Sequence, residues 1–193
     1  SKSNNQLVLR TNNTERVRID TSGRILQGST AGRNTSLMAA QPTYQLEGVG
    51  SNASNIGIFC NSNGAAAGGI EFGKTRGTAV GGTTVVQSGD DLGHISFEGS
   101  DGSAQRVAAR INVQVDGTPG SSDMPGRIRF LTTPDGSASE VERMRINSSG
   151  KVNIGDTQMS SNLLNIEDGT AAAIDIASHG TGGDTAYIGV KKS

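Results

Sequence analysis

One fourteen-residue sequence occurs twice in this chain, at 15–28 and again at 142–155. The first copy reads ERVRIDTSGRILQG and the second reads ERMRINSSGKVNIG, so the differences between them keep the chemistry at each place. The two copies begin 127 residues apart. Self-similarity at such a spacing is typical of chains built from modules that stack along an axis, each leaning on its neighbours.

Each copy predicts a β-hairpin. Charged and apolar residues alternate at its start, which is the period of a strand with one buried face, so Val17 and Ile19 are expected to point inward. A short polar segment follows and ends in Gly23 in the first copy and in Gly150 in the second. Glycine adopts a positive φ without strain, and a type I turn closed by such a residue is a common hairpin loop.

The composition indicates that one chain cannot build an ordinary core. Leu, Ile, Val and Phe make up 39 of the 193 residues, glycine accounts for 28, and tryptophan is absent. The net charge of −1 does not favour disorder through charge repulsion, and strand-like alternation recurs along the chain. We therefore expect an all-β, elongated homo-oligomer that completes its core with identical copies. The alternative is a flexible linker rich in Gly, Ser and Asn.

The repeat predicts the domain organisation. An expected strand at 6–10 precedes the first hairpin, and one at 126–131 precedes the second. Downstream of the first hairpin, 44–47 and 55–58 have an imperfect echo at 174–176 and 187–190. We expect the end of one module, a complete β module and the start of a further module at 1–28, 29–155 and 156–193. The early arrival of the first hairpin suggests a piece of a longer chain.

A smaller motif of Ile, a polar residue and Phe recurs within the central module. Its copies are Ile70 to Phe72, Ile95 to Phe97 and Ile128 to Phe130. Residues two apart lie on one face of a strand, so these pairs are expected to supply large groups to a core. The polar stretches 73–93 and 116–126 are expected to be surface loops, where ligand contacts are usually carried.

Catalytic candidates are few. Glycoside hydrolysis needs two carboxyl groups about 5 to 10 Å apart, and the acids that lie close in sequence are Asp90, Asp91, Glu98 and Asp101. Their setting is polar and Gly-rich, without aromatic residues for a sugar platform or an apolar pocket to raise a pKa. We expect them to be solvated loop acids, and the expectation is that the chain is not an enzyme.

The other reactive side chains favour structural roles. His94 and His179 are the two histidines, and neither lies near a nucleophile and an orienting acid. On a rotation axis of the expected homo-oligomer, His94 could meet its symmetry mates and hold an ion, an alternative that we keep. The single cysteine, Cys60, is expected to be a small buried or half-buried apolar group. Gly64 to Gly69 lack the Gly-Lys-Ser/Thr ending of a phosphate loop. We therefore predict no catalytic, cofactor-binding or metal-binding residues and no cofactor.

The charge pattern argues against polyanion binding. The chain has 17 basic and 18 acidic residues, so it has no basic footprint for nucleic acid. The arginines at 16, 18, 143 and 145 have Glu15 and Glu142 as adjacent partners, and we expect cross-strand or interchain ion pairs on the surface. No apolar run reaches the roughly 18 residues of a membrane span and no signal peptide opens the sequence, so no membrane insertion is expected.

The segment 142–155 closely resembles a recurrent segment of bacteriophage tail fibre and tailspike proteins, where it is often found before a C-terminal intramolecular chaperone domain. The series of strands and loops from Gly93 to Phe130 is similar to the repeat that precedes it in those fibres. The resemblance implies a homotrimeric fibre shaft that projects from the virion, contacts other tail proteins and supports attachment to a host surface glycan or protein. It carries over no protease activity.

Two other functions stay open at this point. A bacterial surface adhesin or stalk would share the Gly/Asn/Ser/Thr-rich β repeats. A polysaccharide-degrading tailspike would need a pair of catalytic acids. The resemblance favours a structural component of a viral tail fibre, located in the virion and acting outside the cell.

Overall fold

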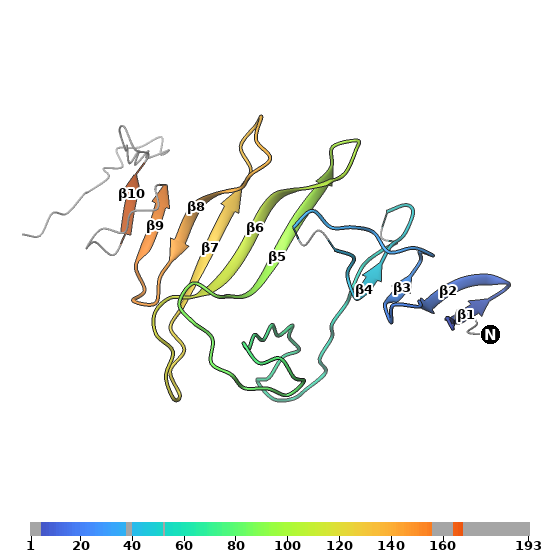
Figure 1. Ribbon diagram of the computed structural model, residues 1–193, viewed down its shortest axis with the longest axis horizontal. Helices are drawn as coiled ribbons and strands as arrows, with labels where there is room; N and C mark the ends of the chain where they lie inside the picture. The colour runs from blue at the N-terminus through green and yellow to red at the C-terminus, as the bar shows by residue number, and fades with distance from the viewer. Residues whose placement is uncertain (1–4, 38–39, 52, 156–163, 168–193) are drawn as a thin grey trace, which may run out of the picture.

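The computed structural model describes residues 5–37, 40–51, 53–155 and 164–167. This part of the chain consists of β-strands, turns and extended segments, and none of the described residues is helical. The strands form two sheets, one of four strands and one of six (Figure 1). In chain order they are β1 Leu7–Thr11, β2 Thr14–Ile19, β3 Ile25–Gln27, β4 Tyr44–Leu46, β5 Asp91–Ser100, β6 Gln105–Val115, β7 Gly126–Thr132, β8 Val141–Ile146, β9 Val152–Gly155 and β10 Leu164–Glu167.

The four-stranded sheet has the order β1-β2-β3-β4, with antiparallel neighbours except for the parallel pair β3 and β4. A parallel pair needs a crossover connection. Here the crossover lies over one face of the sheet, where Arg18 donates a hydrogen bond to the Thr30 carbonyl (3.1 Å) and the Arg33 N–H donates to Gln45 Oε1 (2.8 Å). Leu26 is buried beneath it.

The six-stranded sheet has the order β10-β9-β8-β7-β6-β5. Strands β5 to β9 pair in an antiparallel meander, and β10 adds to β9 in parallel. The β3–β4 crossover also reaches this sheet, because the backbone N–H groups of Ser36 and Leu37 donate to the Glu98 carboxylate on β5, at 3.1 and 3.3 Å.

The two sheets share one arrangement of four strands. The pairings of β1 to β4 recur in the same order in β7 to β10: antiparallel, antiparallel, parallel. Both also have a bulge at the same place, between Leu9 and Arg10 in the first and between Phe130 and Leu131 in the second. The duplicated sequence thus forms the same local structure twice.

The predicted hairpins are confirmed. In the first, the Gly23 N–H donates to the Asp20 carbonyl at 3.0 Å, and in the second the Gly150 N–H donates to the Asn147 carbonyl at 3.0 Å. The glycines have φ values of 78° and 75°. The expected strands at 6–10 and 126–131 correspond to β1 and β7.

One predicted strand is wrong. Residues 70–72 form no strand, and they make no backbone-to-backbone hydrogen bond with the described part of the chain. The echo at 174–176 and 187–190 lies outside the described residues. The counterpart of β4 is instead β10, since Leu164 pairs with Val152 as Tyr44 pairs with Ile25.

The apolar core of the single chain is small. Among the described residues only Leu26, Val86, Val115 and Leu131 are buried apolar side chains, whereas nineteen large apolar side chains are exposed. Buried polar side chains outnumber the buried apolar ones. The described part of the chain contains no helix that is long and apolar enough to cross a membrane.

A candidate assembly face

The six-stranded sheet carries rows of apolar residues on one face. Directly paired residues of neighbouring strands point to the same side of a sheet. The central row therefore runs across five strands as Ile95, Ile111, Phe130, Met144 and Ile154. A second row beside it contains Gly93, Val113, Ile128, Ile146 and Val152. We call the face formed by these two rows and Phe97 the apolar face.

The apolar face is uncovered within the chain. Ile95 is 50% exposed, Phe97 54% and Ile154 39%, although strands normally bury their apolar side. The expectation that the Ile and Phe pairs fill a core is therefore wrong for one chain. They do share a face, but nothing in the described part of the chain packs over most of it.

The four-stranded sheet repeats this arrangement. Leu7, Ile19, Ile25 and Tyr44 form a row across all four strands, and each is exposed. The crossover covers the opposite side, which carries Arg18 and Leu26. The inward orientation expected for Ile19 is thus wrong within one chain, because the face that carries it is the uncovered one.

The opposite face of the six-stranded sheet is polar and better buried. Asn112 is fully buried and pairs in register with Arg129, and Asn153 is 1% exposed and pairs in register with Arg145. Glu142 accepts hydrogen bonds from Arg129 Nε (2.5 Å) and from Arg145. Ion pairs and hydrogen bonds join many side chains of this face, whereas the apolar face has no such contacts among the described residues.

Burial opposes the charge of Glu142, but hydrogen bonds from Arg145 and Arg129 outweigh it and lower the pKa of its carboxyl. The corresponding Glu15 has its pKa lowered chiefly by a hydrogen bond from Arg18. Arg16 and Arg143 donate instead to the hydroxyls of Thr11 (2.8 Å) and Thr132 (3.0 Å). The expected ion pairs therefore form between Glu15 and Arg18 and between Glu142 and Arg145. Arg16 and Arg143 do not take part in them.

The structure places the candidate acids toward the two ends of β5, with Asp90 and Asp91 at its start and Glu98 and Asp101 toward its end. Asp91 and Glu98 lie at opposite ends of β5, about 23 Å apart at the usual rise of a strand. Asp90 pairs with Arg76 (2.6 Å) and Asp101 with Arg106 (2.8 Å), and these hydrogen bonds lower the pKa of both carboxyls. Burial opposes ionisation of Asp91, but hydrogen bonds from Gln114 and Asn112 lower its pKa.

The remaining candidates are scattered. His94 is half-buried on β5 and pairs in register with Asn112, on the polar side of the sheet. His179 lies outside the described residues. Cys60 is exposed, so its expected burial is wrong for one chain. The described residues contain no group of three metal-ligating side chains.

The two predicted surface loops meet around a hollow of about 610 Å³. Lys74, Thr75 and 82–86 line it from the first loop, and Gly120, Ser121 and Met124 from the second. The sequence predicts both loops but not that they lie close together. Both loops are tied to the end of β6, because the Gly89 N–H donates to the Val115 carbonyl (2.9 Å) and the Asp116 N–H donates to the Pro125 carbonyl (2.8 Å).

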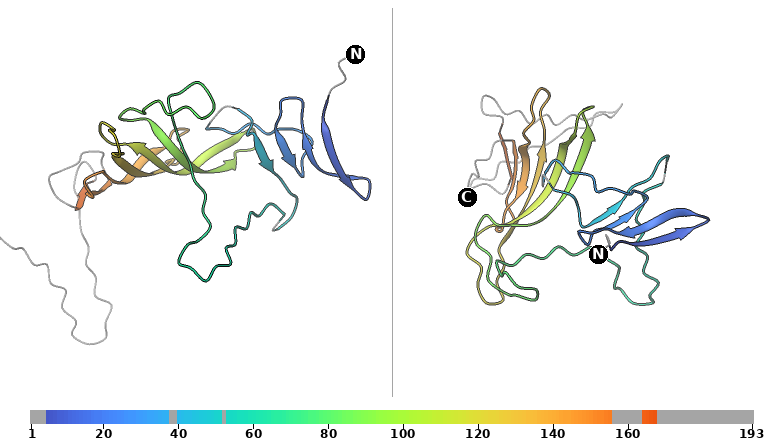
Figure 2. Two further views of the ribbon diagram at one scale, coloured as in Figure 1. Left: turned by 90° about the horizontal axis from the view of Figure 1, so that it is seen from below. Right: turned by 45° about the vertical axis from the view of Figure 1, so that its right-hand side comes forward.

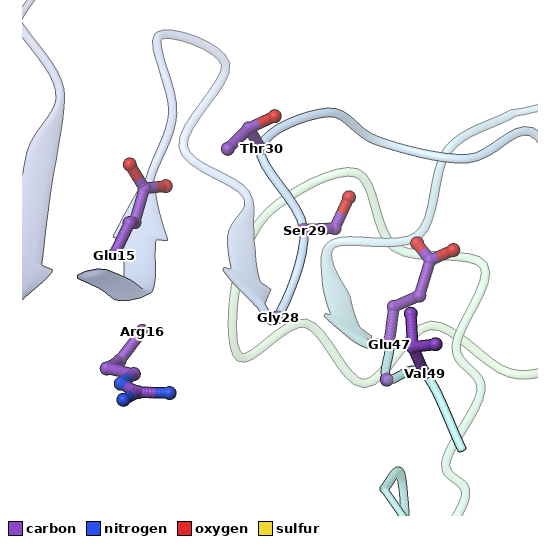
Figure 3. A pocket seen from close by; sticks show the side chains of 8 residues that line it. Glu15, Arg16, Gly28, Ser29, Thr30, Glu47 and Val49 are labelled. Carbon is purple, nitrogen blue, oxygen red and sulfur yellow. The ribbon is translucent and has the colours of Figure 1, made fainter.

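A second hollow, of about 340 Å³, lies at the ends of β2, β3 and β4 (Figure 3). The carboxylates of Glu15 and Glu47 line it, and Arg16 points away from Glu15. Each carboxylate is already paired, Glu15 with Arg18 and Glu47 with Arg33. The hollow therefore offers no unpaired carboxylate to a ligand.

The fold is similar to that of a phage tail fibre. The chain resembles the carboxy-terminal domain of the bacteriophage T5 L-shaped tail fibre, with a TM-score of 0.58 and 14% identity over 93% of this chain and 74% of that one. A second structure, of that domain with its intra-molecular chaperone domain, gives a TM-score of 0.55 and 14% identity, covering 90% of this chain and half of the other. No protein-family model and no curated protein matches the chain.

Proposed function

We propose that the chain is a structural segment of a viral tail fibre, in which three identical copies bury their apolar faces against one another. The uncovered apolar face is the observation that carries this proposal. A contiguous apolar surface of this kind marks an interaction site on a soluble protein. Identical chains related by a closed rotation cover one another's faces without leaving an open edge.

The proposed role in the virion is mechanical. A shaft of such modules, with boundaries as expected at 28 and 155, spaces and orients a receptor-binding region. Threefold symmetry multiplies weak contacts to a host surface through avidity. The similarity to the T5 tail fibre domain supports this role. The hollow between the two surface loops is where a host glycan or protein would touch the segment, if it does so directly.

We propose that the segment is not an enzyme. The separation of Asp91 from Glu98 supports this, as does the lowered pKa of Asp90, Asp91 and Asp101, since a general acid needs a raised one. Incubation of the purified protein with host capsule or lipopolysaccharide tests it. Release of reducing sugar ends would favour the polysaccharide-degrading tailspike instead.

The oligomeric state is tested by light scattering on the purified chain. The expected mass is three times the 19.8 kDa of one chain. Ile95→Asp, which places a charge on the apolar face, should shift the mass toward that of one chain. Val80→Asp is the matched control, because Val80 is fully exposed in a loop outside both sheets. A wild-type mass of one chain would refute the assembly.

The fibre role is tested with antibodies raised against the chain. They should decorate a fibre of the virion in electron micrographs and reduce adsorption to the host. Decoration of a bacterial surface in the absence of phage would instead favour the adhesin or stalk.

A further inference from the structure

Part of the segment between β4 and β5 stands away from both sheets (Figure 2). We call residues 56–72 of this segment the arm. Residues 56–75 make no backbone-to-backbone hydrogen bond with the described part of the chain. Backbone N–H and C=O groups are nearly always paired when a segment is buried, so an ordered extended segment without such pairs has unused hydrogen-bonding capacity.

The arm is apolar and exposed. Its large apolar side chains are all more than half exposed: Ile56, Ile58, Phe59, Ile70 and Phe72. No charged residue occurs between Glu47 and Glu71, although charged residues make up 18% of the chain. Exposed segments of soluble proteins are usually charged, and an uncharged apolar one marks a contact with another molecule.

The two halves of the arm run beside each other. The Cys60 thiol lies 3.8 Å from the Ala66 carbonyl oxygen, and a Cβ on Gly68 would lie 2.9 Å from the Ile58 side chain. The halves together form a narrow ribbon rather than a free coil. Their mutual contact leaves the large side chains uncovered.

The end of the arm already touches the apolar face. A Cβ on Gly93 would lie 2.6 Å from Phe72 Cβ, so Phe72 occupies the place where a side chain at position 93 would project. Gly93 shares the face of Ile95 because the two lie two residues apart in β5. The C-terminal end of the arm thus lies on the apolar face at β5, which is an edge strand of the sheet.

We propose that the arm is exchanged between copies, so that in the assembly residues 56–70 pack on the apolar face of a second copy of this chain. This inference rests on the proposed homo-oligomer and names the segment that joins its members. Residues 56–70 of the arm and the apolar face are both uncharged and mostly uncovered, so each can bury apolar side chains of the other. Exchange of identical segments about a rotation axis satisfies every copy equally.

Cys60 provides the direct test, because it is the one cysteine of the chain and is exposed in the single chain. Its reaction with a maleimide is followed in the native assembly and in denaturant. If a second copy covers the arm, the native rate should be at least about tenfold slower, as expected when labelling requires local opening. A native rate close to the denatured rate overturns the proposal.

Substitutions in the arm give a second readout. Phe59→Asp should convert the trimer into smaller species, whereas Asn61→Asp, which adds the same charge at a polar place in the arm, should not. Circular dichroism of Phe59→Asp checks that the sheets remain folded. A trimer unchanged by Phe59→Asp overturns the proposal.

The neighbouring surface is identified by cross-linking. Phe97→Cys places a second thiol on the apolar face, and oxidation by dissolved oxygen with copper ions should then join Cys60 of one copy to the new thiol of another as a disulfide, because two covered thiols in contact need no bulky reagent. Ser103→Cys, at the exposed tip of the β5–β6 hairpin, should give no such product. A linked product from Ser103→Cys, or none from Phe97→Cys, overturns the assignment of the apolar face.

The light-scattering mass separates the two proposals. A wild-type trimer with a reactive Cys60 would refute the exchanged arm and leave the assembly intact. A wild-type mass of one chain would refute both.

Discussion

Asp20 and Asn147 close their hairpins in the same way. Asp20 Oδ1 accepts hydrogen bonds from the N–H groups of Ser22 (2.9 Å) and Arg24 (3.0 Å). Asn147 Oδ1 accepts from the N–H groups two and four residues further on, at 3.1 and 2.9 Å. Both copies of the duplicated sequence thus have a side-chain oxygen that accepts two backbone hydrogen bonds in the turn.

We expect Asp20→Ala to destabilise the protein by about 1 to 3 kcal/mol, because it leaves two turn N–H groups without their partner and removes the ion pair with Arg24. Asp20→Asn should cost less, since Asn147 shows that an amide oxygen serves the same turn. Urea unfolding at a fixed protein concentration measures both, because the stability of an oligomer depends on that concentration. Equal losses for the two variants would contradict this role of the oxygen.

Gly28 gives a prediction about the parallel pair of strands. It follows β3 with a φ of 77°, and a Cβ there would lie 1.8 Å from the Glu47 carbonyl oxygen. Gly28→Ala should therefore cost at least about 2 kcal/mol, from the left-handed backbone and from the displacement of the chain after β4.

Gly99→Ala is the matched control for Gly28→Ala. A Cβ at Gly99 meets no atom within 4 Å, so this change should leave the free energy of unfolding nearly unaltered. Urea titrations of both variants give the comparison. A loss for Gly28→Ala no larger than that for Gly99→Ala would mean that the strand contact relaxes freely.

The sequence was sufficient to predict the hairpins because their determinants are local. Alternation fixes the strands, and Gly23 and Gly150 fix the turns. The longest strand, β6, has a weaker signal, because Ile111, Val113 and Val115 alternate with polar residues but Val107, Ala108 and Ala109 do not. It also lacks the Ile and Phe motif that marks its neighbours β5 and β7.

Long-range features could not be predicted in the same way. β10 pairs with β9 across a connection whose length differs from that between β3 and β4. The spacing of the repeat therefore does not locate β10. The alternation in β5 showed which residues share a face but not whether that face is covered. Covering depends on what lies beyond the single chain, and for the same reason Cys60 was expected to be buried.

The last prediction concerns the dependence of stability on pH. The folded-state pKa of Glu142 is lowered below its ordinary value, so its contribution is fully present above the unfolded pKa of about 4.3 and is lost as the pH falls through the folded value. Glu142→Gln should therefore lower stability at pH 7 and flatten the fall in stability below about pH 4. Removing a buried carboxylate charge between two arginines costs about 3 to 5 kcal/mol when the cations stay uncompensated. Asp135→Asn, in the exposed loop after β7, is the control and should leave the profile unchanged. Urea midpoints measured from pH 3 to pH 7 give the comparison, and parallel profiles for wild type and Glu142→Gln would contradict the assigned role of this carboxylate.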